Sequence, residues 1–194
     1  MHSIELLLDE AADDDVRREW SALAEAGLPS QARHSGETNA PHITLVARAE
    51  ITAEHDDRLR AVAAGLPMGI ELGALVVFGG PPRGLVLARL AVVTRGLLSL
   101  HEAVHRAVAA GNAGDSPHTL PGRWTPHVTL ASRLTPDQLA TAVETLDAHR
   151  RASDDGTTRG SSSPSSSPRD SAQAVALRRW DSTSRTVTPL GPAL

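Results

Sequence analysis

The sequence predicts an α+β fold built from two similar halves. Two observations support this prediction. The stretch Pro41-His42-Ile43-Thr44-Leu45 recurs as Pro126-His127-Val128-Thr129-Leu130, and helix-like and strand-like segments alternate along the chain. Each copy of the stretch is preceded by a helix and a loop and is followed by another helix. A duplicated α+β unit accounts for this order.

Apolar periodicity and turn residues predict the individual elements. Alternating apolar residues indicate strands, and apolar residues three or four positions apart indicate helices, whose ends are marked by Thr, Gly or Pro. Two β-branched runs joined by a Gly/Pro-rich loop indicate a hairpin. The expected elements are, in order, a strand over 3–8, a helix from the acidic stretch 9–15 to Gly27, the first repeated strand, a helix from Thr52 to Gly65, a hairpin over 70–78 and 85–93, a helix over 95–110, the second repeated strand, a helix from Thr135 to about Ala148, and strands over 172–180 and 185–190.

Length and composition restrict the classes of protein to which the chain can belong. A chain of 194 residues, 40% of them apolar, can form a globular domain with its own core. The formal net charge of −4 argues against non-specific nucleic-acid binding through a global basic field. Cysteine is absent, which excludes disulfides and thiol nucleophiles. No signal peptide or membrane-spanning run stands out, so we expect a cytoplasmic protein without a membrane partner.

One segment differs in character from the rest of the chain. Residues 150–171 contain Asp154-Asp155-Gly156 and a Ser/Pro-rich run, which bury too little apolar area to offset their ordering entropy. Strand-like sequence resumes at Ala172. We therefore expect a single domain over residues 1–194 with a disordered insertion at 150–171.

The repeated stretch places two histidines and two threonines where they can act together. On a strand, His42 and Thr44 share one face, as do His127 and Thr129. If both faces line one cleft, one imidazole can be the general base and the other the general acid. Thr hydroxyls donate to phosphate oxygens without adding charge, which suits in-line attack on a phosphodiester. The sequence therefore predicts a phosphodiesterase with His42 and His127 catalytic and with no metal or other cofactor.

Four further residues are candidate substrate contacts. Arg48 and Arg133 each follow their histidine by six positions, so regular strands would carry both guanidiniums to the face of the histidines, where they could bind phosphate. Arg123 could also contact phosphate. Trp124 could stack on a base or pack between the two halves.

On these motifs the chain resembles the two-histidine phosphoesterase superfamily, specifically its LigT-like branch of bacterial 2'-5' RNA ligases and RNA 2',3'-cyclic phosphodiesterases. The resemblance covers nearly the whole chain except the Ser-rich insertion. It implies a bilobal, pseudo-twofold fold in which two antiparallel sheets, flanked by helices, enclose a central cleft lined by His42, Thr44, His127 and Thr129.

The resemblance also implies an activity in RNA processing. Relatives hydrolyse 2',3'-cyclic phosphate ends to 2'-phosphates, and some join RNA ends through 2'-5' linkages. We therefore expect RNA ends or nucleotide cyclic phosphates as partners, and a monomeric protein. The sequence leaves open which histidine is the acid and which is the base.

Two other functions have to be considered. His101-Glu102-x-x-His105 matches the zinc-peptidase pattern, in which two histidines bind zinc and Glu102 is the base. No third ligand stands out, however, because Val108 and Gly111 occupy the positions where the extended pattern has Gly and His. We interpret the two histidines as part of a solvated helix face. The second alternative is a non-catalytic RNA- or nucleotide-binding protein on the same scaffold.

Overall fold

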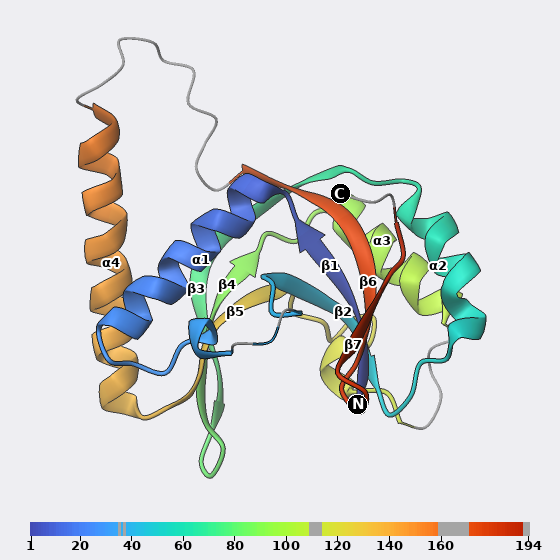
Figure 1. Cartoon of the computed structure of the whole chain (residues 1–194), viewed down its shortest axis with the longest axis horizontal. Coiled ribbons are helices and arrows are strands. Elements are labelled where there is room, and N and C mark those ends of the chain that lie inside the picture. Colours follow the sequence, from blue (N-terminus) through green and yellow to red (C-terminus); the bar gives the residue numbers. More distant parts are fainter. Residues whose placement is uncertain (35, 37, 109–113, 159–170, 192–194) are drawn as a thin grey trace.

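The computed structural model describes residues 1–34, 36, 38–108, 114–158 and 171–191, and Figure 1 shows the chain. Strands and helices alternate as the sequence predicts. The elements are β1 (His2–Leu8), α1 (Glu10–Glu25), the short helix η1 (Gln31–Arg33), β2 (His42–Arg48), η2 (Ala53–His55), α2 (Asp56–Ala63), β3 (Met68–Gly80), β4 (Gly84–Ala91), α3 (Arg95–Ala107), η3 (Pro117–Thr119), β5 (His127–Leu134), α4 (Pro136–Thr158), β6 (Ser171–Asp181) and β7 (Thr186–Pro189).

The strands form one seven-stranded antiparallel sheet in the order β1-β2-β5-β4-β3-β6-β7. β1 also pairs with β6, so the sheet has one half made of β1, β2, β6 and β7 and another made of β3, β4 and β5. The halves meet where β3 pairs with β6, and again where β2 and β5 share the single pair Ile43–Val128. The expected α+β architecture is thus confirmed, with the two expected sheets joined into one.

The helices cover the two halves in pairs. In Figure 1, α1 and α4 lie together beside the half formed by β3, β4 and β5, whereas α2 and α3 lie together beside β1, β2 and β6. α1 follows β1 in the chain but packs on β5, and α3 follows β4 but packs on β2. Each repeated strand is therefore supported by a helix that comes from the other half of the sequence.

Buried aliphatic side chains from helices and strands form one continuous core. The helix residues in this core recur at the predicted helical spacing, so that each helix turns one apolar stripe toward the sheet. They include Val16, Trp20 and Leu23 of α1, Leu59 and Ala63 of α2, Leu97 and Val104 of α3, and Ala142 and Leu146 of α4. Side chains cap three of these helices: Asp9, Thr94 and Thr135 accept hydrogen bonds from the amides of Ala12, Leu97 and Gln138, respectively.

The last helix differs from the sequence prediction. α4 ends at Thr158, beyond the expected end near Ala148, so the predicted disorder is wrong for residues 150–158. Ion pairing between Arg151 and Asp147 one turn earlier supports this extension. Residues 159–170 of the predicted insertion lie outside the described residues, and β6 begins at Ser171. None of the described helices is long and apolar enough to cross a membrane.

Candidate active site

The two repeated motifs lie side by side at the junction of β2 and β5. Ile43 and Val128 pair across this junction, and both are fully buried. In an antiparallel pair, the neighbours of paired residues lie opposite one another on the other face. His42 therefore lies beside Thr129, and Thr44 lies beside His127. The structure brings together all four residues that the motif predicts.

Both histidines are oriented by the same backbone contact. His42 Nδ1 lies 2.8 Å from the Ala40 carbonyl oxygen, and His127 Nδ1 lies 2.7 Å from the Thr125 carbonyl oxygen. A carbonyl oxygen only accepts, so Nδ1 must donate in both rings. Each carbonyl belongs to the residue before the proline of its motif. In the neutral rings Nε2 is left as the basic nitrogen.

The surroundings of the two imidazoles are not equivalent, and a buried carboxylate distinguishes His42. Glu5 Oε1 lies 3.6 Å from His42 Nε2. Glu5 is itself fixed, because it accepts a 2.6 Å hydrogen bond from the Ser3 hydroxyl and a 2.7 Å hydrogen bond from Arg178 Nε. When His42 carries a second proton, its Nε2–H can therefore form an ion pair with Glu5.

His127 instead lies against an aromatic ring. The centroids of the His127 and Phe78 rings are 4.6 Å apart, with the planes tilted by 44°. Burial of the ring lowers the pKa of His127, and the nearby positive charge of His42 lowers it further, against the opposing effect of the hydrogen bond to Thr125. The lowered pKa favours the neutral ring, whose Nε2 can accept a proton.

A β-bulge lies at the last residue of each motif. Along β1 and β2, Ile4 pairs with Val46 and Glu5 pairs with Thr44, so Leu45 has no paired residue in β1. Along β4 and β5, Leu130 likewise has no paired residue in β4. The extra residue reverses the alternation of faces beyond each threonine. For Arg48 this irregularity decides where the side chain points, whereas the β4–β5 pairing shifts a second time around Arg133.

The bulge turns Arg48 away from the histidines. Arg48 is only 7% exposed, its Nε donates to Asp115 Oδ1 at 2.8 Å, and its Nη1 donates to the Val108 carbonyl oxygen at 3.0 Å. The prediction that Arg48 shares the face of His42 is therefore wrong, because it assumed a regular strand. Arg48 holds the loop before β5 against the end of β2.

Arg133 is also directed away from the two histidines. It has a left-handed backbone with φ of 62° and lines a separate cavity of about 770 Å³ beside the β3–β4 turn. The turn approaches so closely that a Cβ on Gly84 would lie 2.8 Å from the Arg133 Cα, so only glycine fits there. Ser132, which the sequence analysis did not single out, lines the His127 cavity instead.

Trp124 has a structural position rather than an open stacking surface. Its ring stacks on His101 with centroids 4.0 Å apart and an interplanar angle of 2°. Its indole N–H donates to the Thr44 carbonyl oxygen at 2.9 Å. Packing between the halves, the second of its two expected roles, is the one that the geometry supports. Arg123, by contrast, is exposed and lines the cavity next to His127.

Trp20 is an important residue that the sequence reasoning assigned only to the core. Its indole N–H donates to the Thr129 carbonyl oxygen at 3.0 Å. Trp20 therefore does for the second motif what Trp124 does for the first. Both indoles bind the residue directly before a bulge, where the ladder of the strand is interrupted. No spacing in the sequence indicates this equivalence, because Trp20 and Trp124 stand in different contexts.

The histidines of the zinc-peptidase pattern are buried, so their interpretation as a solvated helix face is wrong. His101 Nε2 lies 2.9 Å from the Thr119 carbonyl oxygen, and His105 Nε2 lies 3.3 Å from the Leu45 carbonyl oxygen. Burial lowers the pKa of both rings. Within the described part of the chain, no three His, Cys, Asp or Glu side chains lie close enough to hold a metal ion. His101 and His105 instead lie on the side of α3 that packs against β2 and the loop before β5.

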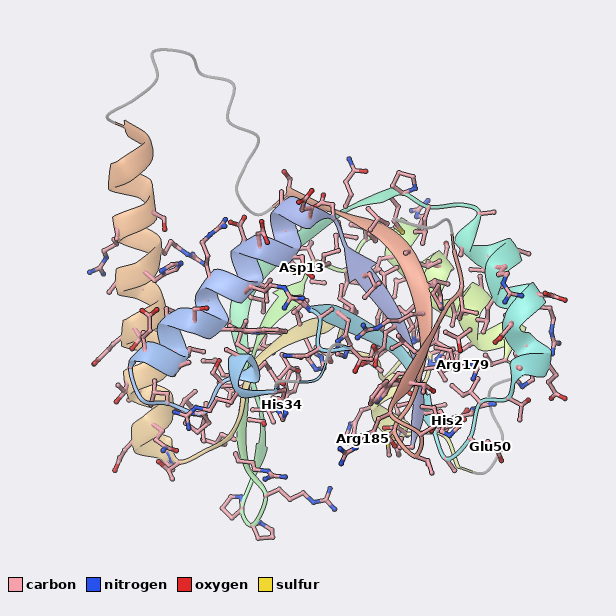
Figure 2. The ribbon with its side chains drawn as sticks, viewed as in Figure 1. His2, Asp13, His34, Glu50, Arg179 and Arg185 are labelled. Carbon is pink, nitrogen blue, oxygen red and sulfur yellow. The ribbon has the colours of Figure 1, made fainter. Side chains whose placement is uncertain are left out.

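Two cavities extend from the paired motifs. The His127 cavity, of about 540 Å³, is lined by Phe78, Gly79, Val86, His118, Arg123, Thr125, His127, Thr129 and Ser132. The His42 cavity, of about 730 Å³, lies in the other half of the sheet, and its walls include Arg33, His34, Arg178, Trp180 and Arg185. Figure 2 labels His34, just after η1, and Arg185, in the turn between β6 and β7.

Both the sequence and the fold are similar to those of known proteins. A family model described as the 2'-5' RNA ligase superfamily matches residues 12–160. The fold is similar to that of Escherichia coli LigT, with a TM-score of 0.51, 17% identity, and 97% of this chain and 93% of that chain covered. It is also similar to Kluyveromyces marxianus Usb1, with a TM-score of 0.50, 15% identity, and coverage of 97% and 96%. A search of curated protein sequences found no match.

Proposed function

Because the chain belongs to the 2'-5' RNA ligase superfamily, we propose that it hydrolyses 2',3'-cyclic phosphate ends of RNA or nucleotides to 2'-phosphates. The superfamily makes the chain an enzyme of the phosphodiesterase or RNA ligase type. The observation that carries the finer proposal is the pairing of the two motifs, with both Nδ1 atoms bound to backbone carbonyls. The proposal places the two Nε2 atoms and the two threonine hydroxyls around one phosphate.

The environments of the two imidazoles support an assignment of their roles, with His127 as the base and His42 as the acid. His127 Nε2 takes a proton from water as the water oxygen forms a bond to phosphorus. The bond from phosphorus to O3' breaks, and His42 Nε2–H gives its proton to O3'. The product is a 2'-phosphate and a free 3'-hydroxyl. Thr44 and Thr129 donate to the non-bridging oxygens, where charge accumulates in the transition state.

The same step accommodates ligation. If a 5'-hydroxyl replaces water as the nucleophile, His127 takes the proton of that hydroxyl and His42 again protonates O3'. The product then carries a 2'-5' linkage, and the reverse reaction exchanges the roles of acid and base. Solved structures of LigT complexed with 3'-AMP and of Usb1 with uridine monophosphate support a nucleotide as the ligand of this fold.

The test is the hydrolysis of adenosine 2',3'-cyclic phosphate in the presence of EDTA. We expect activity in wild type and a decrease of about 10²–10⁴-fold in both His42→Ala and His127→Ala, which remove a general acid or base. His149→Ala, on α4 and away from the motifs, is the matched control and keeps its activity. Activity lost to EDTA, or retained in both active-site variants, contradicts the proposal.

The assay also separates the proposal from a non-catalytic function. A protein that binds cyclic-ended RNA or cyclic nucleotides without turning them over under any of these conditions is a binding protein on this scaffold. In that case His42→Ala and His127→Ala weaken binding but have no rate to reduce.

A further inference from the structure

The described lining of the His42 cavity is predominantly basic. Its described lining includes Arg33, Arg178 and Arg185, together with His34 and His42, whereas Glu5 is its one described carboxylate. The chain as a whole carries a formal net charge of −4, so this concentration of positive charge is local. A cavity of this composition favours an anionic ligand.

The one described carboxylate is already neutralised. Arg178 Nε donates to Glu5 Oε2 at 2.7 Å, and Arg178 Nη1 donates to the Thr38 carbonyl oxygen at 2.9 Å. Glu5 therefore does not compensate the other arginines. Among the described residues, the guanidinium groups of Arg33 and Arg185 have no hydrogen-bond or ion-pair partner. Both guanidiniums remain available for a ligand.

The turn that carries Arg185 is rigidly built. The Asp181 carboxylate accepts hydrogen bonds from the Thr183 amide at 2.7 Å and from the Ser184 hydroxyl at 2.7 Å, and these bonds lower the pKa of Asp181 to about 2. Arg185 follows with a φ of 57°, a left-handed conformation that costs a non-glycine residue energy. The turn thus holds one arginine in a disfavoured conformation at the rim of the cavity, as functional residues often are.

Trp180 provides an aromatic surface in the same cavity. Trp180 pairs with Ser3 across β1 and shares the strand face of Arg178, whose neighbour is Glu5. The indoles of Trp20 and Trp124 donate to backbone carbonyls, whereas Trp180 has no such partner among the described residues. Its half-buried ring lines the cavity, where a nucleobase can stack on it.

We infer that the His42 cavity binds the nucleotide that carries the cyclic phosphate, with Trp180 contacting its base and Arg33 and Arg185 its 5'-phosphate. The inference rests on the proposed function. O3' leaves toward His42, so the ribose lies on the side of His42 and water arrives from the side of His127. A 5'-phosphate is present where the terminal nucleotide is joined to a chain. The preferred substrate is therefore an RNA end rather than a free cyclic mononucleotide.

The test compares two substrates, adenosine 2',3'-cyclic phosphate and a diadenylate that ends in the same cyclic phosphate. We expect wild type to have a kcat/KM at least tenfold higher for the diadenylate, with the preference decreasing as salt is raised. Arg185→Gln should lower the ratio of the two kcat/KM values about tenfold. Arg151→Gln, an exposed arginine of α4, is the matched control and keeps the wild-type ratio. Equal kcat/KM values in wild type, or an unchanged ratio in Arg185→Gln, overturn the inference while leaving the proposed function intact.

A binding measurement tests the inference independently of turnover. Calorimetry with adenosine 3'-phosphate and with a diadenylate carrying a 3'-phosphate should give a Kd at least tenfold lower for the diadenylate in wild type. Arg185→Gln should remove most of that difference. If neither cyclic substrate is hydrolysed, the proposed function fails, and this measurement still decides the inference. Equal affinities for the two ligands reject it.

Discussion

The indole N–H of Trp20 donates a hydrogen bond to the carbonyl oxygen of Thr129 at 3.0 Å. Trp20 lies on α1, which follows the first strand, whereas Thr129 belongs to the second motif. The corresponding bond from Trp124 to Thr44 is 2.9 Å long. Each repeated motif is thus held, at the residue before its bulge, by a tryptophan from elsewhere in the chain.

Replacing Trp20 by Phe should impair both stability and activity. The variant leaves the Thr129 carbonyl without its donor, which costs about 1–3 kcal/mol when the group is buried. Small displacements of Thr129 and His127 should lower kcat/KM by about 10–10²-fold. Val16→Ala on the same helix, also buried, should destabilise the protein without this loss of activity. Wild-type kcat/KM in Trp20→Phe would show that the bond does not position the site.

The pH profile should reveal the environment of His127. Burial against Phe78 lowers the pKa of His127 from its ordinary value of 6.5, so the acidic limb of kcat/KM should have its midpoint below pH 6.5. A base must be unprotonated, and a lowered pKa therefore extends activity toward acid. Phe78→Ala admits water and should move the midpoint upward. A midpoint that stays in place assigns the acidic limb to another group.

Arg48 should matter for stability rather than for catalysis. Arg48→Met removes the buried guanidinium that donates to the Asp115 carboxylate, and we expect this to cost about 3–5 kcal/mol. Arg48→Met combined with Asp115→Leu should recover part of this loss in urea unfolding. Arg133→Met, at an exposed position, should change stability by less than about 0.5 kcal/mol. A large decrease in kcat with unchanged unfolding in Arg48→Met would return Arg48 to the active site.

Acid should destabilise the protein through His101 and His105. Burial lowers the pKa of both rings in the folded state, so the unfolded chain takes up protons near pH 6.5 before the folded protein does. Stability is therefore fully present above pH 6.5 and is lost as pH decreases toward the lowered values. The melting temperature should fall between pH 7.5 and 5.5. The double variant His101→Gln and His105→Gln should show a smaller decrease, whereas the single variant His149→Gln should behave as wild type.

The fold was largely accessible from the sequence. The strand that carries His42 and the strand that carries His127 are where their period-two patterns place them, and the helix over 95–107 lies within its predicted range. These features depend on local periodicity, which a single sequence displays. The end of α4 was missed because hydrophilic residues can continue a helix through ion pairs such as Arg151–Asp147.

What the sequence determined by itself is the pair of motifs: His42, Thr44, His127 and Thr129 share faces because adjacent strand positions alternate, whatever else the chain does. Only the tertiary structure decided which other residues join them. A one-residue bulge beyond Thr44 turned Arg48 into the interior, and two register shifts beyond Thr129 left Arg133 outside. Strands from the two ends of the chain brought Arg178 and Arg185 to the cavity of His42. Bulges and contacts between distant segments depend on packing against neighbouring strands, which no local pattern in the sequence records.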